Sequence, residues 1–157
     1  MEDIWEVAKK IEIEGKDFYI RLARESDSEE MAGVFHFLAG QEEEHFDIFM
    51  SMQDGKKPAR AETRKASIIA KEAFIKIAKD FNNLKPFKHT EDLFRKAISL
   101  EEETIEYYLS ILDKLKNIEQ EAVVKAIIEE EEDHKAVMES IIEFNNEPKE
   151  WFENMEF

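Results

Sequence analysis

Apolar residues recur every three or four positions along most of the chain, which is the spacing of amphipathic α-helices. Glycine and proline, which interrupt helices, number only four and three. We interpret three short segments as breaks between helices: the polar turn residues over 26–28, the segment 54–58 with Gly55 and Pro58, and the segment 82–86 with Pro86. The pattern therefore predicts helical segments over about 2–25, 28–52, 62–80, 91–115 and 119–145.

Four long helices and one shorter helix predict an all-α fold, a single four-helix bundle built from two helical hairpins. A long crossover over 53–90 would join the hairpins and carry the short helix. We expect one domain over 1–147 and a short tail over 148–157. The tail contains Trp151, Phe152 and Phe157, which we expect to cap the surface; a partner-binding peptide is the alternative.

The two halves of the chain align without a gap when one is shifted by 89 residues. Matching residues then include Ala8 and Ala97, Glu12 and Glu101, Tyr19 and Tyr108, Glu42 and Glu131, and His45 and His134. A repeat of this kind indicates two helical hairpins of one design, joined by the crossover.

Glutamate and histidine interrupt the apolar seams of two helices. The seam of the second helix is Phe35, Leu38, Glu42, His45, Phe49 and Met52, and the last helix repeats it as Val124, Ile127, Glu131, His134, Met138 and Ile141. In the first helix, the predicted core seam is Ile4, Ala8, Ile11, Gly15, Phe18 and Leu22. Beside that seam runs a line seven residues apart, Trp5, Glu12 and Tyr19, which recurs as Phe94, Glu101 and Tyr108.

Charged groups on inner seams must be paired or must bind a metal, because unpaired buried charge is costly. Each Glu-x-x-His pair places a carboxylate and an imidazole one turn apart on one helix face. With Glu12 and Glu101, four carboxylates and two imidazoles converge from four helices, as in di-iron and di-manganese bundles. Two divalent cations would balance the four negative charges, and the ligand types also suit zinc. A metal-free core of protonated or salt-bridged side chains is the alternative.

Other polar residues near these seams have simpler interpretations. Tyr19 and Tyr108 either pack with a satisfied hydroxyl, or hydrogen-bond a ligating carboxylate or supply electrons locally. Glu130 lies four residues before His134 and is a rival ligand, but its repeat mate is Gln41, so Glu131 is preferred. We expect the remaining acids and histidines near the motifs to be surface or satisfied residues: Glu14, Glu43, Glu44, Glu103, Glu132, Asp133, His36 and His89.

Composition narrows the possible functions. The 157 residues include 38 acidic and 22 basic side chains, a formal net charge of −16, which argues against nucleic-acid and anionic-membrane partners. The absence of cysteine excludes disulfides, iron–sulfur clusters and thiolate metal sites from this sequence. With neither an apolar leader at the N-terminus nor an apolar run long enough to span a membrane, we expect a cytoplasmic protein.

The motifs over roughly 3–145 resemble the ferritin-like di-iron carboxylate superfamily, and within it the rubrerythrin-like proteins. The resemblance implies a ferritin-like bundle in which Glu12 and His45 bind one metal, Glu101 and His134 bind the other, and Glu42 and Glu131 bridge the two. Two features depart from typical rubrerythrins. This sequence contains no cysteine-rich rubredoxin domain, and it has Thr104 where they carry an additional Glu. The ligand set is closer to that of bacterioferritins, although the short tail and the Lys-rich crossover helix argue against a cage.

The resemblance implies a non-haem di-iron peroxidase, active in defence against oxidative stress. It would reduce hydrogen peroxide or dioxygen with two iron ions, or with manganese or zinc in their place, using electrons from an external donor protein. We expect a homodimer. Two alternatives stay open: an iron-binding ferroxidase for storage or delivery, and a non-catalytic acidic helical protein that binds a partner.

Overall fold

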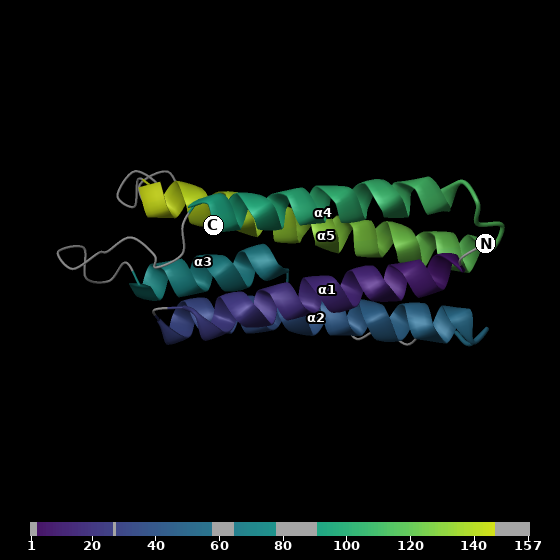
Figure 1. The fold of residues 1–157 in the computed structure, drawn as a ribbon, viewed down its shortest axis with the longest axis horizontal. Helices are drawn as coiled ribbons and strands as arrows, with labels where there is room; N and C mark the ends of the chain where they lie inside the picture. Colours follow the sequence, from purple (N-terminus) through teal and green to yellow (C-terminus); the bar gives the residue numbers. More distant parts are fainter. Residues whose placement is uncertain (1–2, 27, 58–64, 78–90, 147–157) are drawn as a thin grey trace.

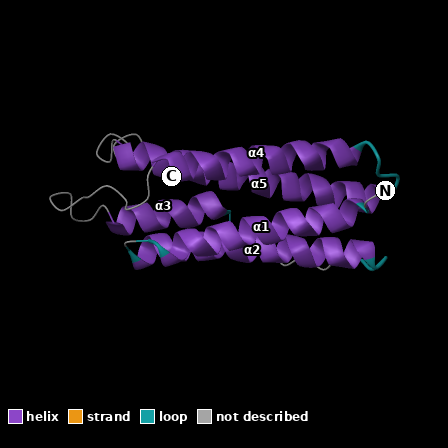
Figure 2. Ribbon diagram, viewed as in Figure 1, coloured by secondary structure: helices purple, strands orange, loops and turns teal. Residues whose placement is uncertain are grey.

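A computed structural model describes residues 3–26, 28–57, 65–77 and 91–146, and within them the regular structure is entirely helical (Figure 2). The helices are α1 (Ile4–Arg24), α2 (Glu29–Gln53), α3 (Ala66–Ile77), α4 (Glu91–Leu112) and α5 (Ile118–Asn146). The predicted all-α class is therefore confirmed. The predicted helices match these bounds closely, except that the third begins later, at Ala66. The aromatic tail, the turn at 82–86 and His89 lie outside the described residues.

Local hydrogen bonds explain where α1, α2 and α5 begin. The side chain of Asp3 accepts a hydrogen bond from the backbone N–H of Trp5 at 2.8 Å, and Ser28 accepts one from Met31 at 3.1 Å. Asn117 accepts from the backbone of Glu119 at 2.9 Å, so the turn before α5 has an N-cap of its own. These contacts satisfy backbone donors that a helix N-terminus leaves without partners.

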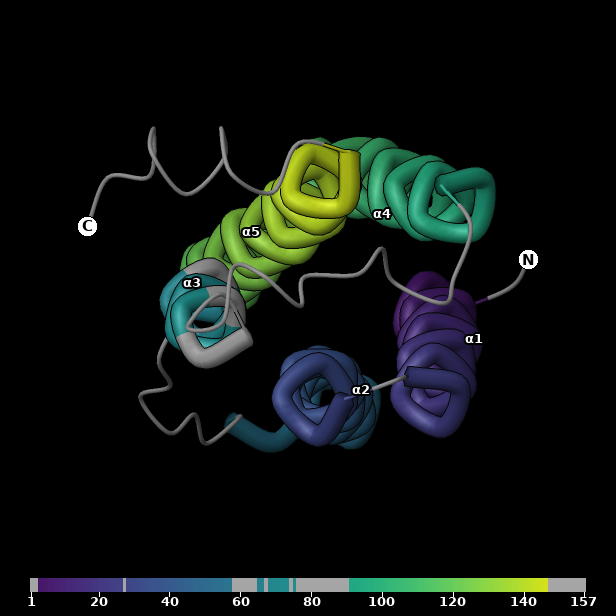
Figure 3. The backbone as a smooth tube through the Cα atoms, turned by 90° about the vertical axis from the view of Figure 1, so that its left-hand side faces the viewer, coloured from purple at the N-terminus to yellow at the C-terminus, as the bar shows by residue number. Residues whose placement is uncertain are grey.

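The four long helices form two antiparallel hairpins, α1 with α2 and α4 with α5 (Figure 1). The view along the bundle places α3 against the outside of α2 and α5 (Figure 3). Helix α2 ends at the opposite end of the bundle from the start of α4, so the connection between them crosses its length (Figure 1). This arrangement is the ferritin-like bundle of repeated hairpins that the sequence predicts.

The apolar core is divided into two clusters with a polar layer between them. One cluster contains residues before position 40 of α2 and after position 136 of α5, and the other contains residues after 47 of α2 and before 129 of α5. The intervening turns of both helices carry the Glu-x-x-His motifs. Each long helix therefore passes from an apolar layer through a polar layer into a second apolar layer.

The buried face of α1 agrees only in part with the seam predicted for it, because Ala8 and Leu22 are buried as predicted and the other members are not. Ile4, Ile11 and Phe18 are only half-buried, whereas the neighbouring line of Trp5, Glu12 and Tyr19 is buried. The reason is rotation about the helix axis. Helix α1 packs mainly on α2, and few of its residues approach α4, so the half-buried members of the predicted seam face the more open α1–α4 side. The seams predicted for α2 and α5 are buried throughout.

Among the described residues, no helix is both long enough and apolar enough to cross a bilayer.

Candidate metal centre

Six ionisable side chains meet in the polar layer at the middle of the bundle. Helices α1 and α4 contribute one carboxylate each, and α2 and α5 contribute one carboxylate and one imidazole each. None of the six is more than 5% exposed: Glu12, Glu42, His45, Glu101, Glu131 and His134. The structure thus brings together every side chain that the sequence singles out as a metal ligand.

The six side chains form two overlapping groups. In each group, one potential ligand atom per residue lies within 4.8 Å of all the others. The first group is Glu12, Glu42, His45 and Glu131, and the second is Glu42, Glu101, Glu131 and His134. Because Glu42 and Glu131 belong to both groups, the arrangement offers two adjacent cation positions that share two carboxylates.

Both imidazoles point their Nδ1 atoms toward the carboxylates. His45 Nδ1 lies 2.8 Å from Glu131 Oε1 and 3.4 Å from Glu12 Oε2. His134 Nδ1 lies 2.8 Å from Glu42 Oε1, without hydrogen-bond alignment. The rings are nearly parallel, with centroids 6.2 Å apart. The Nδ1 atoms are therefore the nitrogens available to a metal.

The cluster contains buried polar atoms that the protein leaves without a hydrogen bond. They comprise one carboxylate oxygen from each of the four glutamates and one imidazole nitrogen: Glu12 Oε2, Glu42 Oε1, Glu101 Oε2, Glu131 Oε2 and His134 Nδ1. An unsatisfied buried polar atom costs about 1–3 kcal/mol, and more when it is charged. Cations bound among these atoms would remove that cost, so the residues fit a metal centre.

Crowding of like charge gives the metal-free cluster a high affinity for protons. Burial, reinforced by the carboxylates of Glu12 and Glu101, raises the pKa of Glu42 well above its ordinary value. Burial opposes the charged form of His45, but the carboxylates of Glu12, Glu130 and Glu131 together outweigh it and raise the pKa of that imidazole well above 6.5. Metal ions entering the cluster would therefore displace protons.

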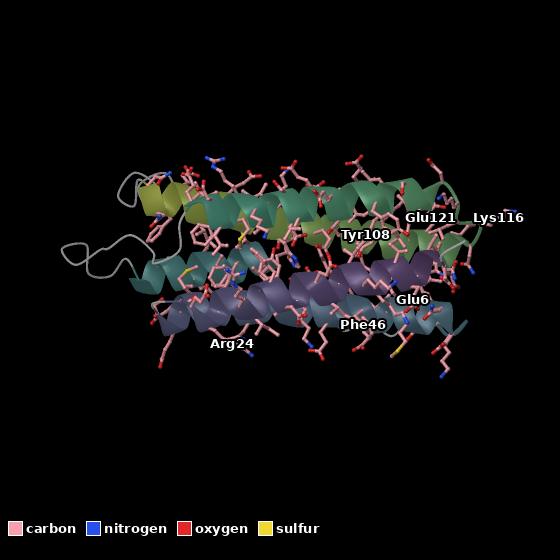
Figure 4. All side chains as sticks on the ribbon, in the orientation of Figure 1. Glu6, Arg24, Phe46, Tyr108, Lys116 and Glu121 are labelled. Carbon is pink, nitrogen blue, oxygen red and sulfur yellow. The ribbon has the colours of Figure 1, made fainter. Side chains whose placement is uncertain are left out.

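Two tyrosines hold the carboxylates of the opposite helix. The hydroxyl of Tyr19 in α1 donates to Glu101 Oε1 in α4 at 2.6 Å, and that of Tyr108 in α4 donates to Glu12 Oε1 in α1 at 2.6 Å. Figure 4 shows Tyr108 inside the bundle. Burial, and then the Glu101 carboxylate, raise the pKa of Tyr19 well above 10, so its hydroxyl stays protonated and able to donate. Each bond leaves the other carboxylate oxygen available to a cation.

A cavity of about 150 Å³ reaches the cluster between α1 and α4. Glu14 and Glu103, both exposed as expected, line its outer part, and Glu42 and Glu101 line its inner part. Gly15 leaves room for the Glu42 carboxylate, because a Cβ at that position would lie 2.8 Å from Glu42 Oε2. Small molecules of the size of water or peroxide have space here beside the carboxylates.

Two residues outside the predicted ligand set contact the outer nitrogens of the imidazoles. Gln41 Oε1 lies 2.6 Å from His134 Nε2, and Glu130 Oε2 contacts His45 Nε2. Glu130 therefore approaches the histidine of the opposite hairpin and is placed in neither group of potential ligands. In the sequence, Gln41 and Glu130 each directly precede the seam glutamate of their own helix, and this shared position is the feature by which they could have been found.

The residues expected at the surface mostly lie there. Glu43, Glu132 and His36 are exposed, while Glu44 and Asp133 are half-buried. None of these side chains belongs to either group of potential ligands among the described residues.

Comparison with known proteins agrees with the site. The family model described as Rubrerythrin matches residues 3–142, which include all four long helices up to Ile142 of α5. No curated protein and no solved structure matches the chain significantly. The family match and the buried cluster of carboxylates and imidazoles together suggest a metal site of the di-iron type. The chain belongs to the rubrerythrin family.

Proposed function

We propose that the cluster binds two iron ions and that the protein reduces hydrogen peroxide with electrons from an external donor. In this proposal Glu12 and His45 hold one ion, and Glu101 and His134 hold the other. Glu42 and Glu131, which belong to both groups, would be shared by the two ions. The observation that supports it most directly is the set of buried carboxylate oxygens that accept no hydrogen bond, one from each of the four long helices. Carboxylate and imidazole ligands suit iron, and also manganese or zinc.

When bound, a ferrous pair supplies the two electrons with which one peroxide and two protons become two waters. The protein's own groups prepare the site for this reaction. The hydroxyls of Tyr19 and Tyr108 orient two carboxylates, and the cavity beside Gly15 admits a small oxidant. The apolar clusters on both sides limit the access of bulk water.

The electrons that restore the ferrous state must come from outside this sequence. The sequence contains no cysteine, so it encodes no thiolate-bound iron centre of its own. We therefore propose a separate redox protein as the donor.

The test is an anaerobic titration of the ferrous protein with peroxide. We expect two ferrous ions per chain, oxidation of two ferrous ions for each peroxide consumed, and faster oxidation by peroxide than by dioxygen. The variant Glu42→Gln should bind less iron, whereas Glu43→Gln, its exposed neighbour, should behave as the native protein does. Oxidation no faster than that of free ferrous ion would refute the proposal.

The same titration separates the alternatives. A ferroxidase would react faster with dioxygen and would accumulate iron beyond two ions per chain. A non-catalytic interaction protein would contain no metal, either as the native protein or as the Glu42→Gln variant. Light scattering would test the expected homodimer.

A further inference from the structure

The two halves of the metal centre differ in the groups that contact their histidines from outside. Each imidazole directs Nδ1 inward and Nε2 toward the opposite hairpin. His45 in α2 contacts Glu130 in α5, and His134 in α5 contacts Gln41 in α2. Gln41 and Glu130 are related by the 89-residue repeat, so equivalent positions carry an amide in one half and a carboxylate in the other.

This difference changes the strength of each imidazole as a ligand. With Nδ1 available to a metal, Nε2 carries the proton and donates to its outer partner. A carboxylate acceptor makes a charge-assisted hydrogen bond and increases the basicity of the imidazole, whereas a neutral amide orients the ring without that gain. Gln41 is 5% exposed and the side chain of Glu130 is 22% exposed, so water screens neither contact completely.

Glu130 also adds negative charge to one side alone. Both cation positions share Glu42 and Glu131, and each has one further carboxylate, Glu12 or Glu101. Each group of potential ligands therefore contains three carboxylates and one imidazole. Outside the two groups, the carboxylate of Glu130 contacts His45, whereas the neutral amide of Gln41 contacts His134. A divalent cation beside His45 is attracted by one more nearby carboxylate than a cation beside His134.

We propose that Gln41 and Glu130 make the two cation positions inequivalent, so that the position beside Glu12 and His45 fills first and the position beside Glu101 and His134 fills second and exchanges more readily. Both residues act through the imidazoles and are positioning residues. The inference rests on the proposed two-metal site. It predicts which of the two positions fills first, which the ligand set alone cannot do because it is the same in both halves.

The order of filling can be measured with zinc as a diamagnetic probe. Apoprotein labelled with ¹⁵N-histidine is titrated with zinc, while the imidazole nitrogens are followed by NMR and the affinities by calorimetry. For the native protein we expect the signals of His45 to change during the first equivalent and those of His134 during the second. Outer hydrogen-bond partners alter metal affinity by about 10–100-fold, so two separate binding steps should be resolved.

Isosteric variants test whether Gln41 and Glu130 cause the order in which the two positions fill. Glu130→Gln should weaken the first step about 10–100-fold and merge the two steps. Gln41→Glu should strengthen the second step, and the double variant should fill the position beside His134 first. A general loss of structure would not reverse the order. The control Glu129→Gln removes the same charge at an exposed neighbouring position and should leave the order unchanged.

The outcomes separate this inference from the proposed function. Two zinc ions that bind with both histidines responding in parallel would refute the inequivalence and leave the two-metal site intact. An unchanged order in the double variant would refute the assignment to Gln41 and Glu130. Failure of the native protein to bind zinc, manganese or ferrous ion would overturn both the site and the inference.

Discussion

Replacing Gly15 by alanine should damage the metal centre without removing any ligand. The added Cβ would lie 2.8 Å from Glu42 Oε2 and 3.3 Å from Glu42 Cδ, whereas ordinary contacts to a Cβ begin at 3.4 Å. The carboxylate must therefore retreat by about 0.6 Å, because the helix backbone cannot move as easily as the end of a side chain. Glu42 is one of the two carboxylates common to both groups, so the displacement would disturb both cation positions.

The size of the effect follows from the tolerance of metal sites. Metal–ligand distances are held within about 0.2 Å, so a shift of about 0.6 Å is too large to absorb. We expect the affinity for divalent metal to fall about 10–100-fold, the range found when the surroundings of a ligand are altered. That loss corresponds to about 1.4–2.8 kcal/mol.

The stability of the metal-free fold should respond differently. Alanine is favoured over glycine inside a helix by about 1 kcal/mol, and the clash involves the movable end of Glu42. We therefore expect the free energy of unfolding without metal to change by no more than about 1 kcal/mol. Weak metal binding with an intact fold is the signature of this prediction.

Calorimetric titration with manganese under anaerobic conditions would measure metal binding, and urea unfolding in the presence of a chelator would measure stability. Gly40→Ala is the matched control. Gly40 also lies within a helix, but a Cβ there would meet nothing within 4 Å. This control should bind metal normally and gain up to about 1 kcal/mol in stability. A folded Gly15→Ala variant that binds two ions with native affinity would refute the reasoning.

Three further predictions concern the tyrosines and the protons of the cluster. Tyr19→Phe and Tyr108→Phe should each cost about 1.5–3 kcal/mol in urea unfolding of the metal-loaded protein, because each removes a 2.6 Å hydrogen bond to a carboxylate. In the control Tyr107→Phe, the hydroxyl that is removed contacts the carbonyl of Ile4 at 3.5 Å, a long distance for a hydrogen bond, and the variant should stay within about 0.5 kcal/mol of the native protein. Urea unfolding in the presence of a chelator should show that the metal-free protein is more stable at about pH 5.5 than at about pH 8.5. The folded-state pKa values of Glu42, Glu131, His45 and His134 are raised, so their contribution is complete below the ordinary values of 4.5 and 6.5 and is lost as the pH rises through the raised values. Greater stability at the higher pH would contradict this sign. Metal binding should release protons, seen as a calorimetric heat that depends on the ionisation enthalpy of the buffer, and a heat independent of the buffer would argue against it.

The sequence by itself determined the helices, the repeated hairpins and the side chains that form the centre. Helical periodicity separates an inner face from an outer face, and the glutamates and histidines that interrupt the apolar faces of α2 and α5 stand out because charge is costly there. The 89-residue repeat then assigns Glu12 and Glu101 to equivalent places on α1 and α4. These inferences require only the geometry of one helix at a time.

Only the tertiary structure decided how the helices are rotated and aligned against one another. The rotation of α1 buries Glu12 and Tyr19 rather than Ile11 and Phe18. Because α1 and α4 are antiparallel, the hydroxyl of Tyr19 donates to Glu101 and that of Tyr108 donates to Glu12. Each tyrosine therefore binds the carboxylate of the opposite helix, and not the one on its own helix.

The same holds for the contacts of Gln41 and Glu130 with the opposite imidazoles, and for the clearance that Gly15 provides to Glu42. Each depends on the distance between side chains of different helices. That distance is set by packing across the whole bundle, because rotating or sliding one helix changes its neighbours without changing its own periodicity.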